Sequence, residues 1–171
     1  FESLISLLTT VCNPLPGLAM LPLIMMWFGI GDIVMIVMIV HGILWPLLSD
    51  LLAGYRAIPG IYRDYTKNIG VKPVTMLRTV VLCAVLPNFI SGLRIGWGRA
   101  WRALIGAEMA FGAIGQLGGL GYYIFIQRTY ANIPNMMSGL LAIIVIGLLV
   151  EEFGFRLLEK HTIQKWGMSR A

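Results

Sequence analysis

The residues of this chain best suited to do chemistry are ionisable side chains inside otherwise apolar segments. They are His41, Arg94, Arg99, Arg102 and Glu108. A charge at the centre of a lipid bilayer costs about 2.5–3.5 kcal/mol or more on insertion scales. We therefore expect these side chains to face a bundle interior, a water-filled cavity or an interface. Two roles stay open: they line a translocation path, or they hold helices together, as a neutral His41 imidazole could do.

Catalysis is not indicated by the sequence. It contains no Ser-His-Asp arrangement, no HExxH and no phosphate-binding loop, and its two histidines stand far apart. A nucleophile without a positioned base does not meet the requirements of covalent catalysis. The Gly-rich stretch that opens 112–136 follows no strand pattern and precedes no Lys-Ser or Lys-Thr pair, so we interpret it as a flexible or re-entrant turn on the outer side. We expect no enzymatic activity in this chain.

A polar, basic stretch at 54–78 interrupts the apolar chain. Its charged residues include Arg63, Asp64, Lys67, Lys72 and Arg78. Pro59 predicts a helix start and Pro73 the first turn of a second helix, while Gly70 between them tolerates the positive φ of a sharp turn. Such an element cannot lie in lipid. We expect it at a membrane face or against a partner protein.

The spacing around Gly70 resembles a loop found in permease subunits of binding-protein-dependent ABC importers, with the pattern E-A-A-x-x-x-G-x9-I-x-L-P. Asp64 stands six residues before the glycine, at the Glu position. Val80 and Leu82 stand ten and twelve residues after it, at the Ile and Leu positions. Three further stretches resemble the nitrate/sulfonate/taurine branch: PLIMMWFGIG at 22–31, LPNFISGLR at 86–94 and AEM at 107–109.

This resemblance covers nearly the whole chain and implies an all-α fold. The fold would be a polytopic transmembrane helical bundle of the type I ABC importer permease kind, one transmembrane permease domain over 1–171 with the cytoplasmic coupling loop 54–78 inside it. The segment 61–76 would couple the bundle to a cytoplasmic ATPase. The coupling residues that the resemblance implies are Arg63, Asp64, Tyr65, Thr66, Lys67, Gly70, Val71 and Lys72.

The same resemblance implies partners and a cargo. ATP and Mg²⁺ would be bound by the partner ATPase, and no cofactor by this chain. The other partners would be a second permease copy, forming a homodimer, an extracytoplasmic solute-binding protein and membrane lipid. The cargo would be a small anionic or polar solute such as nitrate, a sulfonate or taurine. The protein would be a multi-pass protein of the bacterial inner membrane with a cytoplasmic C-terminus.

Three positions depart from the family pattern. Tyr65 and Thr66 occupy the two Ala positions, and Cys83 replaces the usual Pro. The small Ala residues normally allow close packing of the loop, so the departures leave the fit to the ATPase surface open. The chain also begins at Phe1 without Met, where family members usually have further spans, so we expect N-terminal spans to be missing.

Composition independently indicates a membrane protein. Of the 171 residues 58% are hydrophobic and 12% charged, with a mean hydropathy of +0.82. Soluble domains carry about 25% charged residues. The net charge of +5 is concentrated at 56–78 and 156–170, as expected of cytoplasmic membrane-flanking segments rather than of a nucleic-acid-binding surface. Cys12 and Cys83 lie in apolar runs and are expected to be buried hydrophobes.

The chain is expected to contain about four to five spans. After a helix ending near Cys12 and a Pro-rich turn, they run over about 17–28, 33–53, 79–111 and 137–158. The loop 54–78 and the C-terminal tail would lie on one side of the membrane, with 29–32 and 112–136 on the other. Gly92-x-x-x-Gly96 predicts close helix packing. Two other functional classes stay open: an ion-coupled secondary transporter using Glu108 or His41, and a membrane anchor or assembly protein.

Overall fold

Three apolar stretches form the long helices that the sequence predicts as spans. The computed structural model describes residues 2–115 and 117–164, without the side chains of 63, 64, 67, 163 and 164. The first long helix is α3 (Asp32–Arg56). The second is continuous and consists of α5 (Pro73–Met76), a π-helical turn (Leu77–Val81) and α6 (Leu82–Phe111). The third is also continuous and consists of α8 (Ile133–Leu149), a π-helical turn (Val150–Phe155), α9 (Arg156–Glu159) and a further π-helical turn (Lys160–Gln164). All three are long and apolar enough to cross a membrane. They confirm the all-α transmembrane fold and the spans predicted at 33–53, 79–111 and 137–158.

The segment predicted as a span at 17–28 is not a span on its own. α1 (Glu2–Cys12) and α2 (Gly17–Phe28) are separated by the Pro-rich turn and bent by 98° relative to each other. With 12 residues α2 is about 18 Å long, well short of a hydrocarbon core of about 30 Å. Hydropathy alone does not register this change of direction, which follows from Pro14 and Pro16. Within the described residues the spans number three, or up to four if the bent pair counts as one, against the four to five expected.

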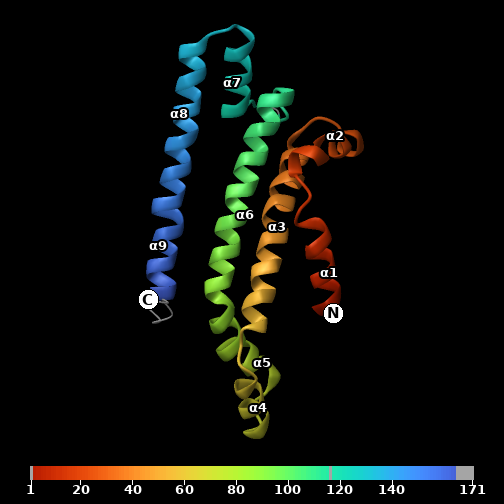
Figure 1. Cartoon of the computed structure of the whole chain (residues 1–171), viewed down its shortest axis with the longest axis vertical. Helices are drawn as coiled ribbons and strands as arrows, with labels where there is room; N and C mark the ends of the chain where they lie inside the picture. The colour runs from red at the N-terminus through yellow and green to blue at the C-terminus, as the bar shows by residue number, and fades with distance from the viewer. Residues whose placement is uncertain (1, 116, 165–171) are drawn as a thin grey trace.

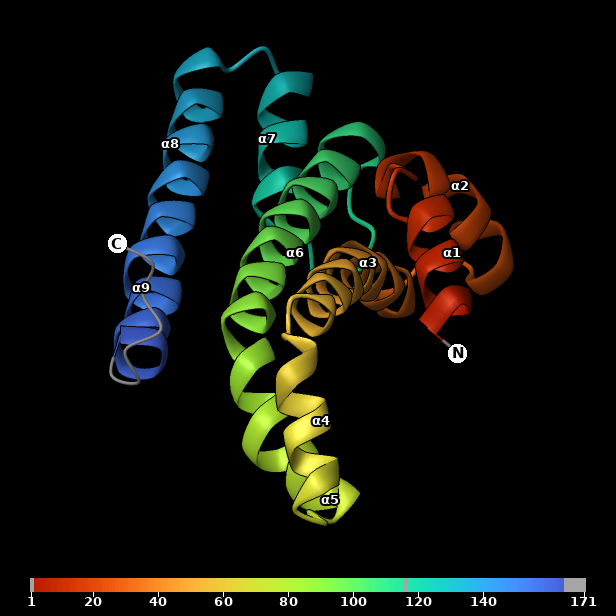
Figure 2. The same ribbon diagram turned by 60° about the horizontal axis from the view of Figure 1, so that its bottom comes forward.

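α3 and α6 pack with their backbones almost in contact (Figures 1 and 2). A Cβ atom added at Gly96 would lie 2.8 Å from the Cα of Ile43, and one added at Gly92 would lie 2.9 Å from the Cα of Leu47. From the other side, a Cβ at Gly42 would lie 3.0 Å from the Cα of Ala100. The close packing predicted from Gly92-x-x-x-Gly96 is confirmed. We call this contact the glycine seam (Gly42, Gly92 and Gly96).

The two ends of the bundle differ. At one, which we call the loop end, α4 (Gly60–Asn68) and α5 project past α3 (Figures 1 and 2). At the opposite end lie α2, α7 (Leu120–Thr129) and the turn into α8. Six buried residues form a hydrophobic core at this opposite end: Leu21, Ile24, Val34, Met38, Ala107 and Ile114. The predicted arrangement of 54–78 at one end and of 29–32 and 112–136 at the other agrees with the structure, whereas the tail from 165 onward lies outside the described residues.

The segment 112–136 is more regular than predicted. It contains the ten-residue helix α7, followed by a turn in which Ala131 has φ of +53° and Asn132 caps α8 by accepting a hydrogen bond from the backbone N–H of Asn135 at 3.3 Å. The chain enters and leaves this segment at the same end of the bundle (Figure 1). The return of the chain was predicted, and the helix within it was not.

The glycine seam predicts opposite effects for two neighbouring substitutions. Gly96→Ala places a methyl group 2.8 Å from backbone and should lower stability by about 1–3 kcal/mol, the usual cost of overpacking. Gly98→Ala meets only the end of the Arg102 side chain at 3.6 Å and should be neutral or stabilising by about 0.5–1 kcal/mol, because helical Gly is unfavourable. Thermal melting of both variants in detergent checks this. Equal melting temperatures would contradict the seam.

Candidate functional sites in the loop and the bundle

α4 and α5 form a helical hairpin joined at Gly70. The backbone there has φ of +68°, and no atom lies within 4 Å of the position of an added Cβ. Glycine is therefore required by the backbone conformation and not by lack of space. The N–H of Val71 donates to the carbonyl oxygen of Thr66 at 3.0 Å and closes the turn after α4. The positive φ predicted at this glycine is confirmed.

Thr66 holds the hairpin together from inside. Its side chain is buried, and its hydroxyl donates to the carbonyl oxygen of Tyr62 at 2.9 Å and lies 3.4 Å from the sulfur of Met76 at the end of α5. Among the other residues predicted for coupling, Tyr65 and Lys72 are exposed and Val71 is half-buried. The side chains of Arg63, Asp64 and Lys67 lie outside the described part of the structure. Thr66 thus shapes the surface that Tyr65 presents.

Large apolar side chains cover the outer face of α4. Ile61 is 72% exposed and Tyr65 62%, and Tyr62 and Ile69 are more than half exposed. Sequence reasoning on the charges missed Ile61, Tyr62 and Ile69. The signal was present, because 61, 65 and 69 recur at the i, i+4, i+8 spacing of one helix face. We call Ile61, Tyr62, Tyr65 and Ile69, which directly follows α4, the outer stripe of α4. A contiguous exposed apolar patch on an otherwise polar helix is typical of a contact surface.

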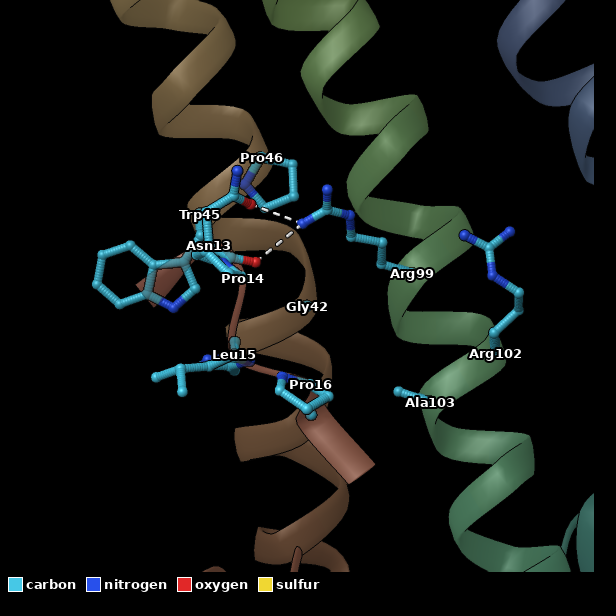
Figure 3. A pocket seen from close by; sticks show the side chains of 12 residues that line it. Asn13, Pro14, Leu15, Pro16, Gly42, Trp45, Pro46, Arg99, Arg102 and Ala103 are labelled. Atoms are coloured by element: carbon cyan, nitrogen blue, oxygen red, sulfur yellow. Dashed lines mark hydrogen bonds between the residues drawn. The ribbon is translucent and has the colours of Figure 1, made fainter. Parts of the chain in front are cut away.

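A second candidate site is a cavity of about 340 Å³ between the α1–α2 turn, α3 and α6 (Figure 3). Arg99 reaches from α6 to the turn and donates from Nη1 to the backbone carbonyl oxygen of Asn13 at 3.2 Å and to its side-chain Oδ1 at 2.6 Å. His41 and Trp45 line the cavity from α3, their rings 6.2 Å apart. We call it the α1–α2 cavity. It brings together His41, Arg99 and Arg102 from the predicted path residues.

Two residues that line the α1–α2 cavity each have a ring nitrogen that is buried without a hydrogen-bond partner among the described residues. These nitrogens are Nε2 of His41 and Nε1 of Trp45. The hydrogen bond by which His41 could hold a neighbouring helix is therefore not made by its Nε2 atom. Arg102 also lines the cavity, but its guanidinium folds back over Gly98 on α6, where an added Cβ would lie 3.6 Å from Nη1 (Figure 3). Sequence reasoning missed Trp45 and Asn13, which no charge or motif marks.

Glu108 lies away from this cavity, at the start of α7. It is buried, and its two carboxylate oxygens accept hydrogen bonds from the backbone N–H groups of Gly119 at 2.9 Å and Gly121 at 3.1 Å. A carboxylate at a helix N-terminus satisfies otherwise unpaired donors and interacts favourably with the helix dipole. Glu108 therefore joins α6 to α7. Both of these partners are backbone groups, and Arg102, six residues earlier on the same helix, is not one of them.

Arg94 also joins helices. Its guanidinium pairs with Glu151 and, at 3.2 Å, with Glu159 in the continuous helix that starts at Ile133. These partners hold the loop-end part of that helix against α6. The predicted group of path residues thus divides in two: Arg94 and Glu108 bridge helices, whereas His41, Arg99 and Arg102 line a cavity.

The described residues form a multi-pass helical bundle with a hairpin that projects beyond its long helices. The family comparison defines the class of this membrane protein. The profile described as "Binding-protein-dependent transport system inner membrane component" matches residues 1–160. The chain belongs to this family of ABC transporter permeases.

Curated relatives include permeases with named cargoes. The chain is 32% identical to the taurine transport system permease protein of Escherichia coli over 149 residues, covering 87% of this chain and 52% of the relative. It is 30% identical over 151 residues to a Bacillus subtilis protein named for aliphatic sulfonate transport, covering 88% and 52%. It is 26% identical over 143 residues to the nitrate import permease protein of a Synechocystis strain, covering 84% and 50%. The chain spans about half the length of these relatives.

The Glu108 bridge predicts that α7 depends on a carboxylate. Glu108→Gln leaves one acceptor for two backbone donors, so the loss of a charged hydrogen bond worth about 1.5–3 kcal/mol should speed amide exchange at 119–124 about tenfold or more. Glu152→Gln is the control, because Glu152 pairs with Arg156 on its own helix. Hydrogen exchange read by mass spectrometry compares them. Unchanged exchange in the Glu108→Gln variant would contradict the role of Glu108 in joining α6 to α7.

The Arg94 contacts predict a specific loosening of the last helix. Arg94→Gln removes two ion pairs of about 0.2–1 kcal/mol each and should raise amide exchange at 150–162 severalfold. Arg156→Gln breaks only a pair within one helix and should have little effect. The charge swap Arg94→Glu with Glu151→Arg should restore protection. Failure of the swap to restore protection would show that charge pairing is not what holds this helix.

Proposed function

We propose that this chain is the transmembrane permease subunit of an ATP-driven importer and couples to a cytoplasmic ATPase through the segment 61–76. The observation that carries the proposal is the helical hairpin at the loop end, with the outer stripe of α4 exposed on it. Closure of an ATPase that held this stripe would push the hairpin as a unit, because the Thr66 and Gly70 turn makes it compact. ATP and Mg²⁺ would bind in that partner.

The loop end is the cytoplasmic face in this proposal. Arg56, Lys72 and Arg78 lie at or near this end, and the helix from Ile133 runs back toward it with further basic residues from 156 onward. Accumulation of Lys and Arg in short cytoplasmic segments is the usual bias of membrane proteins. The C-terminus would then be cytoplasmic, and a solute-binding protein would approach the opposite end.

The names of the relatives support a small anionic or polar cargo, such as nitrate, a sulfonate or taurine. A second permease copy would complete the path across the membrane, and lipid would cover the remaining apolar surface. A proton-coupled carrier is less well supported, because both oxygens of the buried Glu108 carboxylate are already bound by backbone donors. A proton-carrying role would require Glu108 to give up these bonds in every cycle.

Gly70→Arg tests the coupling role. Arginine at φ of +68° is strained, and its side chain would stand on the hairpin surface, so a bound ATPase should be lost from the purified complex. The full-length protein is purified in mild detergent, and co-eluting subunits are identified and counted by mass spectrometry. Wild type should retain a P-loop ATPase in about equal amount to the permease, because each hairpin would occupy one groove on one ATPase subunit.

Gly29→Arg is the matched control. Gly29 also has a positive φ, +75°, and no atom within 4 Å of an added Cβ, so the substitution brings the same charge to the opposite end of the bundle together with backbone strain of its own. This variant should keep the ATPase. Retention of the ATPase by both variants, or its absence from wild type, would contradict the proposed coupling.

A further inference from the structure

We propose that the α1–α2 cavity is a binding subsite for the anionic group of a small oxyanion, with Arg99 as its charged anchor and Arg102 as a second cation at its edge. This inference rests on the proposed function, because it assigns a charge-recognising site to the translocation path. Neither the family assignment nor the resemblance around Gly70 places a ligand here. Four observations carry it.

The first observation is the charge balance of the lining. Among the twelve described residues that line the cavity there are two arginines and neither Asp nor Glu. Arg99 makes its hydrogen bonds to a neutral amide oxygen and a backbone carbonyl oxygen, and no described carboxylate pairs with it. By contrast, Arg94 on the same helix pairs with two glutamates. The positive charge of Arg99 is therefore left for a ligand to balance.

The second observation is a second positive charge at the cavity. Arg102 lines it beside Arg99, and no described carboxylate pairs with Arg102. Two like charges at one cavity attract an anion and oppose a cationic ligand.

The third observation is location. Arg99 and His41 stand in the middle parts of α6 and α3, where a cation is expensive unless water or an opposite charge reaches it. The glycine seam brings these two helices together beside the cavity, since Gly42 both lines it and contacts Ala100. The site is thus held by rigid helices on two sides. The α1–α2 turn, fixed by Asn13, forms the third side (Figure 3).

The fourth observation is size. A volume of about 340 Å³ lies at the lower end of the range of about 300–1,000 Å³ for ligand pockets. One guanidinium without a carboxylate partner in such a space suits a compact group with a single negative charge. Arg102, folded over Gly98 at the edge of the cavity, has no described carboxylate partner either and can turn toward a passing anion. A site with neutral partners and one fixed charge binds weakly enough to release its ligand.

The test compares two probes that differ in charge but not in shape. Methanesulfonate and the uncharged methanesulfonamide are added separately to the full-length permease complex in nanodiscs, and saturation-transfer NMR follows their methyl signals, which suits weak binding. Methanesulfonate should bind and methanesulfonamide should not. Arg99→Gln should weaken methanesulfonate binding about tenfold or more, the usual effect of losing a charged hydrogen-bond donor. Arg102→Gln should weaken it less, about threefold to tenfold, because Arg102 stands at the edge of the cavity.

Arg128→Gln is the control for the loss of one positive charge. Arg128 lies on α7 over the ring of Phe125, outside the α1–α2 cavity, so this variant should bind as wild type does. A weaker signal in either cavity variant, with Arg128→Gln unchanged, supports the proposal even where the other variant fails to fold. Equal signals from both probes, no signal from either, or a wild-type signal in both cavity variants would overturn it.

The same preparation separates this inference from the proposed function. An ATPase that co-elutes with a permease that binds no methanesulfonate overturns the anion subsite and leaves the importer subunit intact. If methanesulfonate binding depends on Arg99 in a preparation that contains no ATPase, the result supports the subsite and contradicts the coupling role.

Discussion

The contact between the backbones of α3 and α6 is the constraint on which the rest of this structure depends. Three glycines remove the side chains that would separate the helices, and a Cβ added at any of them would lie 2.8–3.0 Å from the Cα of Ile43, Leu47 or Ala100. Helices in lipid gain no hydrophobic driving force from association, and close packing of small residues is one of the interactions that replaces it. The seam connects both candidate sites. One helix enters the projecting hairpin, the other leaves it, and the α1–α2 cavity lies against the same pair.

Two charged side chains hold further helices to the pair joined by the glycine seam. Glu108 ties α6 to the start of α7, and Arg94 ties α6 to the helix that begins at Ile133. Both bridges satisfy their charges with partners from another element, as buried or membrane-embedded charges require. Arg99 differs, because its described partners are neutral oxygens. That difference in partners, more than position along the helix, separates structural charges from a group available to a ligand.

Much of the architecture could be predicted from the sequence, because long apolar runs and glycine spacing act locally. The spans at 33–53, 79–111 and 137–158, the turn at Gly70 and the close packing at Gly92 and Gly96 follow from such patterns. The direction of α2 and the presence of α7 could not, since both depend on packing at the opposite end of the bundle. The pairing of Arg94 with Glu151, 57 residues away, and the gathering of Asn13, Trp45 and Arg99 around one cavity arise from tertiary contacts that no sequence spacing records. The coupling residues and path residues stay predictions.

The last long helix has a consequence for how the protein assembles. Only 6% of its most apolar stretch is buried within the described chain, yet its backbone hydrogen bonds are satisfied internally. In a bilayer such a segment is stable on its own, because hydrocarbon covers its side chains and no backbone group is left unpaired. Contacts with Arg94 and α7 therefore orient this helix without being needed to form it. Its insertion and its docking are thermodynamically separate steps, and weakening the docking contacts leaves a helix that is inserted but free to change its tilt.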